Sequence, residues 1–330
     1  MKNSKEIDIA QKLIRCKSIA PKDGGTLRIV EKECKAMGFK CTKLRFSEKG
    51  FDTINNLYAE IGNGKPHFSF AGHVDIVPAD KKEWKVDPFE GKIKNNFLIG
   101  RGACDMKSAI ACFLSAAKNY LGENKNFKGK ISIIITGDEE TYAVNGTKKI
   151  LIWLKKKKIK IDNCLVGEPT NLKVLGDQIK IGRRGGFNGT VEVQGKAGHS
   201  AWPSRTINPI PALMKMLNNI DKKILDKGTK HFQPSIISIT SIDVGNEALN
   251  VIPAKARGSF NIRFNPRHTI KSLTKWIKKE FNKVGFKYKL ETYVSGNAFL
   301  TKPGKFSELI KKCVKKITRR NPKNATDGGT

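Results

Sequence analysis

Four short motifs in the first half of the chain carry the imidazole and carboxylate groups that bind divalent metal ions. They are GHVD at residues 72–75, GRGACDMK at 100–107, DEE at 138–140 and GEPT at 167–170. Such nitrogen and oxygen ligands are typical of catalytic zinc sites. Any one motif alone is more often a structural histidine or a solvated turn, but the four together predict a hydrolytic metal site. The second motif lacks the GxxxxGK[ST] spacing of a phosphate-binding loop.

Strands and helices that alternate along the chain must position these motifs. The hydrophobic patterns predict strands at 56–61, 67–71, 130–136 and 161–166, and helices at 106–121 and 141–157. This order indicates an α/β domain with a mostly parallel mixed sheet. Because ligands bind at the carboxyl ends of strands in such sheets, the four motifs should meet at one edge. Asp75 should point to the same side as His73 and hold its imidazole.

The pattern changes near residue 180. Strands are predicted at 189–195, 235–242 and 256–264, and helices at 208–226, 269–284 and 305–317. Strands flanked by helices, with Gly and Pro at the corners, indicate a small α+β unit of ordinary domain size. We therefore expect a catalytic domain at 1–179 and 294–330, with an inserted domain at 180–293.

The chain of 330 residues is strongly basic, with a formal net charge of +33 from 63 Lys and Arg against 30 Asp and Glu. This charge raises the question of nucleic-acid binding. However, 51 lysines are spread along the chain against 12 arginines, whereas nucleic-acid readers favour the bidentate guanidinium. No apolar run approaches the ~18 residues of a membrane span. The composition therefore indicates a solvated surface, with neither a nucleic-acid nor a membrane partner.

Seven cysteines are scattered without a CxxC pair. This spacing is typical of reduced thiols in a cytoplasmic protein. The N-terminal residues also lack the apolar block of a secretory signal. We therefore expect the protein in the cytoplasm.

Five segments resemble the M20 metallopeptidase family, and the resemblance runs over nearly the whole chain. They read GHVDIVP, GRGACDMKSAIACFL, TGDEE, CLVGEPT and GRRGGFNGTVEVQGKAGHSAWP. The resemblance implies a zinc-peptidase catalytic domain with an inserted ferredoxin-like dimerisation domain. It also implies a homodimer that holds two zinc ions per subunit, or cobalt in their place.

The resemblance implies metal ligands at four positions that match family motifs. His73, Asp105 and Glu168 would hold one zinc. Asp105 would also bridge to the second zinc, which Glu140 binds. The resemblance further implies a cis peptide between Asp105 and Met106.

Other matching positions imply catalytic and substrate-binding roles. Glu139 would be the general base, and Asp75 the carboxylate behind His73. His199 would reach the site of the partner subunit and polarise the scissile carbonyl. The residues implied in binding a polycarboxylate substrate are Arg183, Arg184, Asn250, Arg263, Gly328, Gly329 and Thr330.

Two further stretches bear on the substrate. GEPTNLKVLGDQIKIGRRGGFNG and NVIPAKARGSFNIRFNPRHT favour family members that hydrolyse the succinyl amide of N-succinyl-LL-2,6-diaminopimelate, a precursor of lysine and peptidoglycan. Hydrolysis of acetylornithine, other acyl amino acids or dipeptides stays open as an alternative. An inactive binding protein on the same scaffold is an alternative of a different class.

The last residues of the chain, 324–330, resemble the family's Gly-Gly-Thr turn, and the chain stops at Thr330. In the family several dozen residues follow, with the closing strands and the final histidine ligand of the second zinc. We therefore expect a chain truncated at its C-terminal end. If it ends there, we expect it to be unstable or weakly active.

Overall fold

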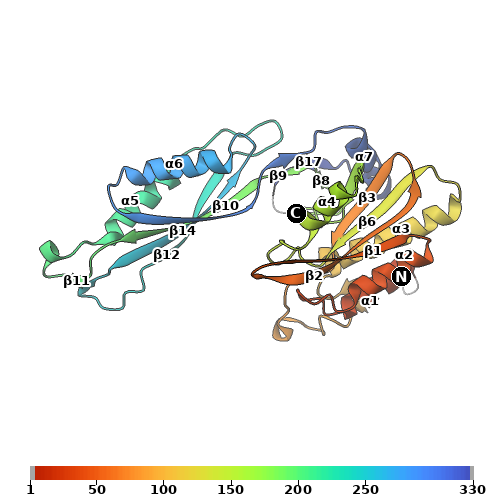
Figure 1. Cartoon of the computed structure of the whole chain (residues 1–330), viewed down its shortest axis with the longest axis horizontal. Helices are drawn as coiled ribbons and strands as arrows, with labels where there is room; N and C mark the ends of the chain where they lie inside the picture. The colour runs from red at the N-terminus through yellow and green to blue at the C-terminus, as the bar shows by residue number, and fades with distance from the viewer. Residues whose placement is uncertain (1–3, 328–330) are drawn as a thin grey trace. The chain divides into compact units, whose positions relative to one another are not determined.

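A five-stranded mixed sheet organises the first half of the chain. In the computed structural model, which describes residues 4–327, the strand order is β1-β2-β6-β3-β7 (Figure 1). The strands in this order are β1 (Lys40–Glu48), β2 (Phe51–Asn63), β6 (Gly129–Thr136), β3 (His67–His73) and β7 (Asn163–Val166). β3 pairs parallel with both β6 and β7, whereas β2 pairs antiparallel with both β1 and β6. The predicted α/β class is confirmed, with two of the four pairings parallel.

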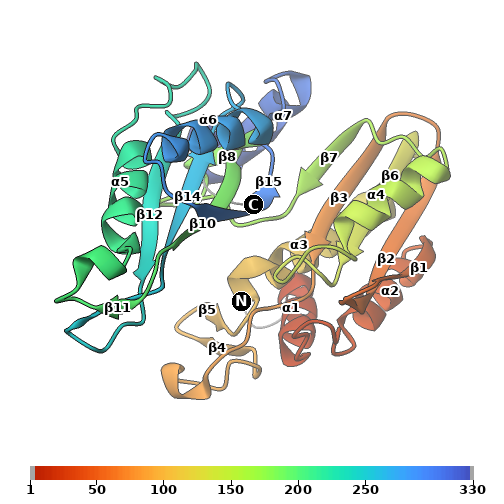
Figure 2. The same cartoon turned by 60° about the vertical axis from the view of Figure 1, so that its left-hand side comes forward.

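Helices cover both faces of this sheet because its central strands alternate buried side chains. On β6, Ile133 and Ile135 pack into one apolar cluster with α1 (Lys5–Arg15), α2 (Thr26–Ala36) and α3 (Ser108–Glu123). Ile134 points to the other face and packs with α4 (Thr147–Lys156), which Figure 2 shows against the sheet. Each fully buried isoleucine contributes about 1.5–3 kcal/mol.

Short elements connect β3 to α3. They are a 3-10 turn (Lys81–Glu83), the hairpin of β4 (Lys92–Lys94) and β5 (Phe97–Ile99), and a π-helical turn (Ala103–Lys107). The helix expected at 106–121 therefore starts in this turn and continues as α3. The Asp105–Met106 peptide is cis, as predicted.

The helix expected at 141–157 begins later, at Thr147. The residues before it form a loop in which Ala143 has a φ of 52°, outside the right-handed helical region. The Asp138 carboxylate accepts the N–H groups of Ala143 and Asn145. This side-chain bonding competes with the helical pattern and delays the start of α4.

The second unit contains a ferredoxin-like βαββαβ sequence, as the resemblance implied. It runs through β10 (Gly185–Gln194), α5 (Pro209–Asp221), β12 (Ile236–Asp243), β14 (Lys255–Phe264), α6 (Ile270–Asn282) and β15 (Tyr288–Gly296). The antiparallel sheet has the order β12-β14-β10-β15. Its core includes Phe260, which meets Phe281 edge to face with ring centroids 6.2 Å apart. The strand β15 was not predicted.

The remaining elements are short strand pairs and one further helix. They are β8 (Gln178–Lys180) with β17 (Lys323–Ala325), β9 (Gly182–Arg183) with β16 (Phe299–Leu300), β11 (Gly198–His199) with β13 (Val251–Ile252), a 3-10 turn (Pro203–Arg205) and α7 (Lys305–Thr318). β8 and β9 thus pair with strands that follow the ferredoxin-like sequence. The chain divides into compact units at Met1–Pro169 and Thr170–Thr330. The expected boundaries at 180 and 293, with 294–330 in the catalytic domain, stay a prediction.

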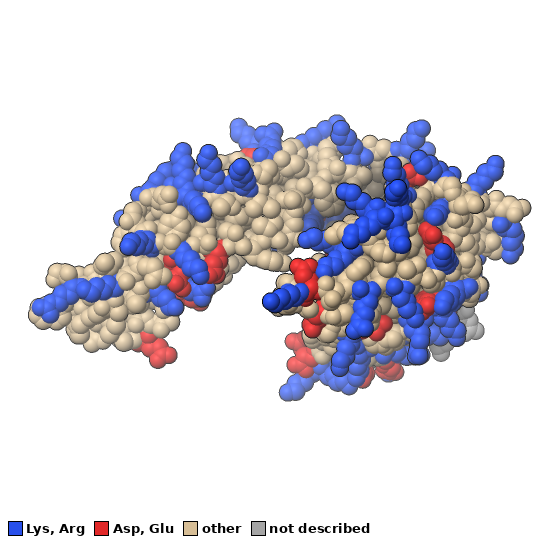
Figure 3. Space-filling view, in the orientation of Figure 1, with Lys and Arg blue, Asp and Glu red and all other residues tan. Residues whose placement is uncertain are grey.

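Lysine and arginine side chains are spread over much of the visible surface, with acidic side chains among them (Figure 3). This distribution is typical of a solvated face. Among the described residues, none of the helices is both long and apolar enough to cross a lipid bilayer.

Candidate metal centre

Three parallel strands bring three of the four motifs to one edge of the first unit's sheet. β3 ends at His73, β6 ends just before the DEE motif, and β7 ends two residues before Glu168. Asp105 comes from the π-helical turn that precedes α3. The four motifs therefore meet where the parallel register predicts that ligands bind.

The imidazole of His73 lies at the middle of this cluster and is 1% exposed. Its Nε2 lies 2.9 Å from the Asp105 carboxylate and 3.5 Å from that of Glu168. Its Nδ1 donates to the backbone carbonyl of Asp75 at 2.9 Å, and the Asp75 carboxylate lies at 3.4 Å. A hydrogen bond from Nδ1 to this carbonyl leaves the lone pair of neutral His73 on Nε2, facing the acids.

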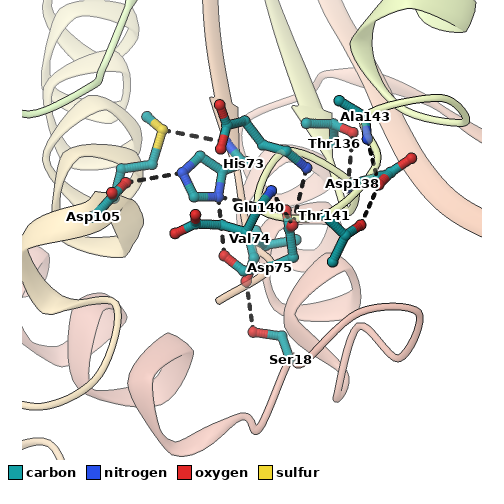
Figure 4. A network of polar contacts seen from close by, with 12 residues as sticks. Ser18, His73, Val74, Asp75, Asp105, Thr136, Asp138, Glu140, Thr141 and Ala143 are labelled. Atoms are coloured by element: carbon teal, nitrogen blue, oxygen red, sulfur yellow. Dashed lines mark hydrogen bonds and ion pairs between the residues drawn. The ribbon is translucent and has the colours of Figure 1, made fainter. Parts of the chain in front are cut away.

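The carboxylate of Asp75 joins the His73 motif to the DEE motif (Figure 4). Its Oδ2 accepts the backbone N–H groups of Glu139 at 2.9 Å and Glu140 at 2.8 Å. Asp75 is 1% exposed, so these bonds form in a dry environment where hydrogen bonds to a charged acceptor are strong. They fix the main chain that carries both glutamates.

Close packing around Met106 explains two of the motif glycines. The Met106 side chain is fully buried, and its sulfur accepts the His73 backbone N–H at 3.3 Å. A Cβ at Gly72 would lie 2.6 Å from the Met106 methyl carbon, and one at Gly167 would lie 2.8 Å from it. Gly72 is therefore favoured by the close approach of Met106, and Gly167 by that of Met106 and of the Phe70 ring, which lies 2.6 Å from the same Cβ position.

Lys107 is a buried cation that sequence reasoning did not single out. It is 0% exposed, and its Nζ donates to the carbonyls of Leu13 and Cys16 at 2.9 Å each. Burial lowers the pKa of Lys107 to about 8. These bonds tie the turn that presents Asp105 to the C-terminal end of α1, where a cation is favourable. In the sequence, Lys107 is marked only by its place at the end of the GRGACDMK motif.

Burial and the contacts among these groups shift their pKa values. Burial acts to lower the pKa of His73, but hydrogen bonds to Asp105 and Asp75 raise it to about 11. The bond to His73 lowers the pKa of Asp105. Burial and the nearby Asp105 raise the pKa of Glu140. Burial raises the pKa of Glu168 to about 7, against the opposing charge of His73.

The donor set fits divalent cations. His73, Asp105 and Glu168 form one group, and His73, Glu139 and Glu140 form another, with the ligand atoms in each group within 4.8 Å of one another. One imidazole with several carboxylates is suited to zinc or a similar ion. Asp105 lies in the first group and Glu140 in the second, so the bridging role of Asp105 stays a prediction.

Two site residues predicted in the second unit lie together. Asn250 Nδ2 lies 3.4 Å from His199 Nε2. His199 Nδ1 accepts the backbone N–H of Ala201 at 3.1 Å. In the neutral imidazole the proton is therefore on Nε2, so the contact with Asn250 Nδ2 joins two donors and is not a hydrogen bond; both groups can donate to an oxygen. Three predicted substrate-binding residues lie outside the described residues: Gly328, Gly329 and Thr330.

The predicted arginines also lie in the second unit, around a pair of glycines. Gly186 on β10 faces Gly296 on β15. The Arg263 guanidinium lies against Gly186, and that of Arg183 lies against Gly296. Because paired residues point to the same face of a sheet, both guanidinium groups lie on one face of the β10 and β15 pair. The backbone N–H of Arg184 donates instead to the carbonyl of Thr326.

Comparison with known proteins places these motifs in a family. The chain matches the family described as Peptidase family M20/M25/M40 over residues 69–330. A curated protein from Parvibaculum lavamentivorans, named succinyl-diaminopimelate desuccinylase, is 50% identical over 329 residues. The match covers 98% of this chain and 83% of that protein.

Two solved structures have the same fold. An M20 family metallo-carboxypeptidase from Sulfolobus solfataricus matches with a TM-score of 0.76 at 18% identity, over 99% of this chain and 87% of that one. A dinuclear metal-binding peptidase of the M20 family from Bacillus subtilis matches with a TM-score of 0.69 at 14% identity, over 98% and 82%. With the match over residues 69–330 and the 50% identical relative, the chain belongs to the M20 peptidase family.

Proposed function

We propose that this chain is a succinyl-diaminopimelate desuccinylase, a metal-dependent amidohydrolase. Water and the succinyl amide of N-succinyl-LL-2,6-diaminopimelate would give succinate and LL-2,6-diaminopimelate. The observation that carries the proposal is the cluster around His73, found in a chain 50% identical over nearly its full length to a protein of that name. A cytoplasmic location agrees with its seven unpaired cysteines.

Two divalent ions, zinc or cobalt, are the proposed cofactors. His73, Asp105 and Glu168 would hold one ion, and Asp105 and Glu140 the other. When bound, such ions polarise the carbonyl and lower the pKa of water toward ~7. Asp75 supports this assignment because its carbonyl orients the His73 ring and its carboxylate orients the Glu140 main chain.

Glu139 is the proposed general base. Its main chain is fixed by Asp75, and its carboxylate lies in the group formed with His73 and Glu140. It would take a proton from the attacking water and return one to the leaving amine. The amide C–N bond breaks as the new C–O bond becomes the succinate carboxylate.

His199 and the arginines would act on the substrate. The Nε2 proton of His199 suits a donor to the developing oxyanion, and Asn250 lies beside it. Arg183 and Arg263 would bind the substrate carboxylates, since the guanidinium fork matches a carboxylate bidentately. Arg184, Gly328, Gly329 and Thr330 are proposed to complete this binding site, and the functional form is proposed to be a homodimer.

A substrate panel tests the proposal. The purified, metal-loaded protein is given N-succinyl-LL-diaminopimelate, N-acetylornithine and simple N-acyl amino acids, and released acid is measured. Clear preference for the succinylated substrate supports the desuccinylase. Preference for acetylornithine or another acyl amino acid would move the chain to a different activity in the same family, and inertness toward all of them with metal bound would favour a binding protein.

A further inference from the structure

We propose that Asp138 is a positioning residue for Glu139 and Glu140, an inference that rests on the proposed function of those two glutamates. Asp138 is 4% exposed. Its Oδ1 accepts the hydroxyl of Thr141 at 2.6 Å and the N–H of Ala143 at 3.1 Å, and its Oδ2 accepts the N–H of Asn145 at 2.8 Å. One buried carboxylate therefore organises the loop that follows both glutamates (Figure 4).

A second set of bonds fastens the start of this loop to the sheet. The N–H of Asp138 donates to the Thr136 hydroxyl at 3.1 Å, which donates to the Asn56 side-chain oxygen at 2.8 Å. The Asn56 amide donates to the carbonyl of Asn145 at 3.0 Å. Thr136, Asn56 and Asn145 are at most 2% exposed. The loop is thus closed into a ring on β2 and β6, in a region where every unmade bond is costly.

The two glutamates are held from both sides by buried carboxylates. Asp75 accepts the N–H groups of Glu139 and Glu140, while Asp138 holds the residues that follow them. The Asp138 bond also supports Ala143, whose φ of 52° lies in the left-handed region that is unfavourable for non-glycine residues.

Two further contacts restrain the same loop: the Asn145 side chain donates to the carbonyl of Asp52 at 2.7 Å, and the Tyr142 ring meets that of Phe51 edge to face. It has no regular secondary structure before α4, and Tyr142 at its tip is 71% exposed. Displacement of a catalytic group by about 1 Å can lower turnover about 100-fold. Loss of the Asp138 carboxylate should therefore displace Glu139 and Glu140, although Asp138 itself is not proposed to contact the substrate.

The test compares Asp138→Asn with wild type and with a matched control. An asparagine keeps the volume, but its NH₂ group faces N–H donors where a carboxylate accepted them. Asp226→Asn is the control, because the Asp226 carboxylate accepts the N–H groups of Gly228 and Ser235 in the second unit. The measurements are kcat, KM, the affinity for zinc by competition with a chelator, and hydrogen exchange of the loop.

We expect Asp138→Asn to lower kcat and zinc affinity by about 10–100-fold each, with KM within about 3-fold of wild type. Loop amides should exchange faster. Asp226→Asn should leave all three constants within about 2-fold, since it removes the same kind of bond from a loop that carries no proposed site residue. A purely structural role for Asp138 would lower thermal stability but leave zinc affinity unchanged in the folded variant, and that result would overturn the inference.

Thr141→Val keeps the test decisive if Asp138→Asn does not fold. It removes one of the three donors to Asp138 and should give a smaller loss, of about 3–10-fold, in kcat and zinc affinity. Wild-type values for Thr141→Val would contradict the inference. If the wild-type protein releases no succinate, the proposed function fails, and the ratio of zinc affinities then decides the role of Asp138 alone.

Discussion

The Asp75 carboxylate accepts the backbone N–H of Glu139 at 2.9 Å, across the edge where β3 and β6 end. The same residue accepts the Nδ1 proton of His73 through its carbonyl. One buried aspartate therefore orients both the imidazole at the centre of the metal group and the proposed general base. This contact links two motifs that are 64 residues apart in the sequence.

Replacing Asp75 should show how much its orientation of Glu139 and Glu140 contributes to turnover, as distinct from substrate binding. We expect Asp75→Ala to lower kcat by about 10–100-fold, with a smaller change in KM, because it frees the main chain of Glu139 and Glu140. Asp75→Asn should be milder, since its amide oxygen still accepts one N–H group. Equal kcat values for wild type and Asp75→Ala in steady-state kinetics would refute this role.

Glu139→Ala tests the general base separately from the metal site. Turnover should fall by at least about 10²–10⁴-fold, the usual contribution of a general base. Zinc should remain bound, because all of the proposed ligands are unchanged. Metal content by mass spectrometry and succinate release together check this expectation, which near wild-type turnover would contradict.

Removal of metal should destabilise the first unit. Burial, with a smaller contribution from neighbouring carboxylates, raises the pKa of Glu140 and Glu168, and a bound cation stabilises their charged forms. We expect a strong chelator to abolish turnover and to lower the thermal midpoint, and added zinc to restore both. An unchanged midpoint and full turnover after dialysis against chelator would argue against a metal enzyme.

The pH dependence of stability should carry a contribution from Asp226 in the second unit. Burial acts to raise the pKa of Asp226, but hydrogen bonds from Ser235, Gly228 and Asn265 lower it to about 2, below the ordinary 3.8. A carboxylate with a depressed pKa stabilises the fold above about pH 4, and this contribution is lost as the pH falls through about 2.

Asp226→Asn should therefore lower the free energy of unfolding by about 1–3 kcal/mol at pH 7, and the difference from wild type should shrink as the pH approaches 2. Denaturant unfolding at several pH values measures it. The exposed Asp221 is a control, because Asp221→Asn should change stability little at any pH. A difference for Asp226→Asn that stays constant between pH 7 and pH 2.5 would rule out this linkage.

The sequence was sufficient to predict the arrangement of the motifs. Runs of β-branched residues, as in β6, predicted the strands. The parallel pairing of β3 with β6 and β7 brings the ends of these strands together, as expected. The ring of Asn56, Thr136 and Asn145 could not be predicted, because it joins residues up to 89 positions apart through side-chain geometry. Likewise, the late start of α4 follows from Asp138 bonds that local periodicity does not contain.

The most direct measurement of the central claim is the ratio of kcat/KM for N-succinyl-LL-diaminopimelate to that for N-acetylornithine, with metal-loaded protein. Arginines that bind the extra carboxylates should make this ratio at least about 100, since a site built to bind a charged group discriminates strongly against a substrate that lacks it. A ratio near one, or a preference for N-acetylornithine, would contradict the proposed desuccinylase activity.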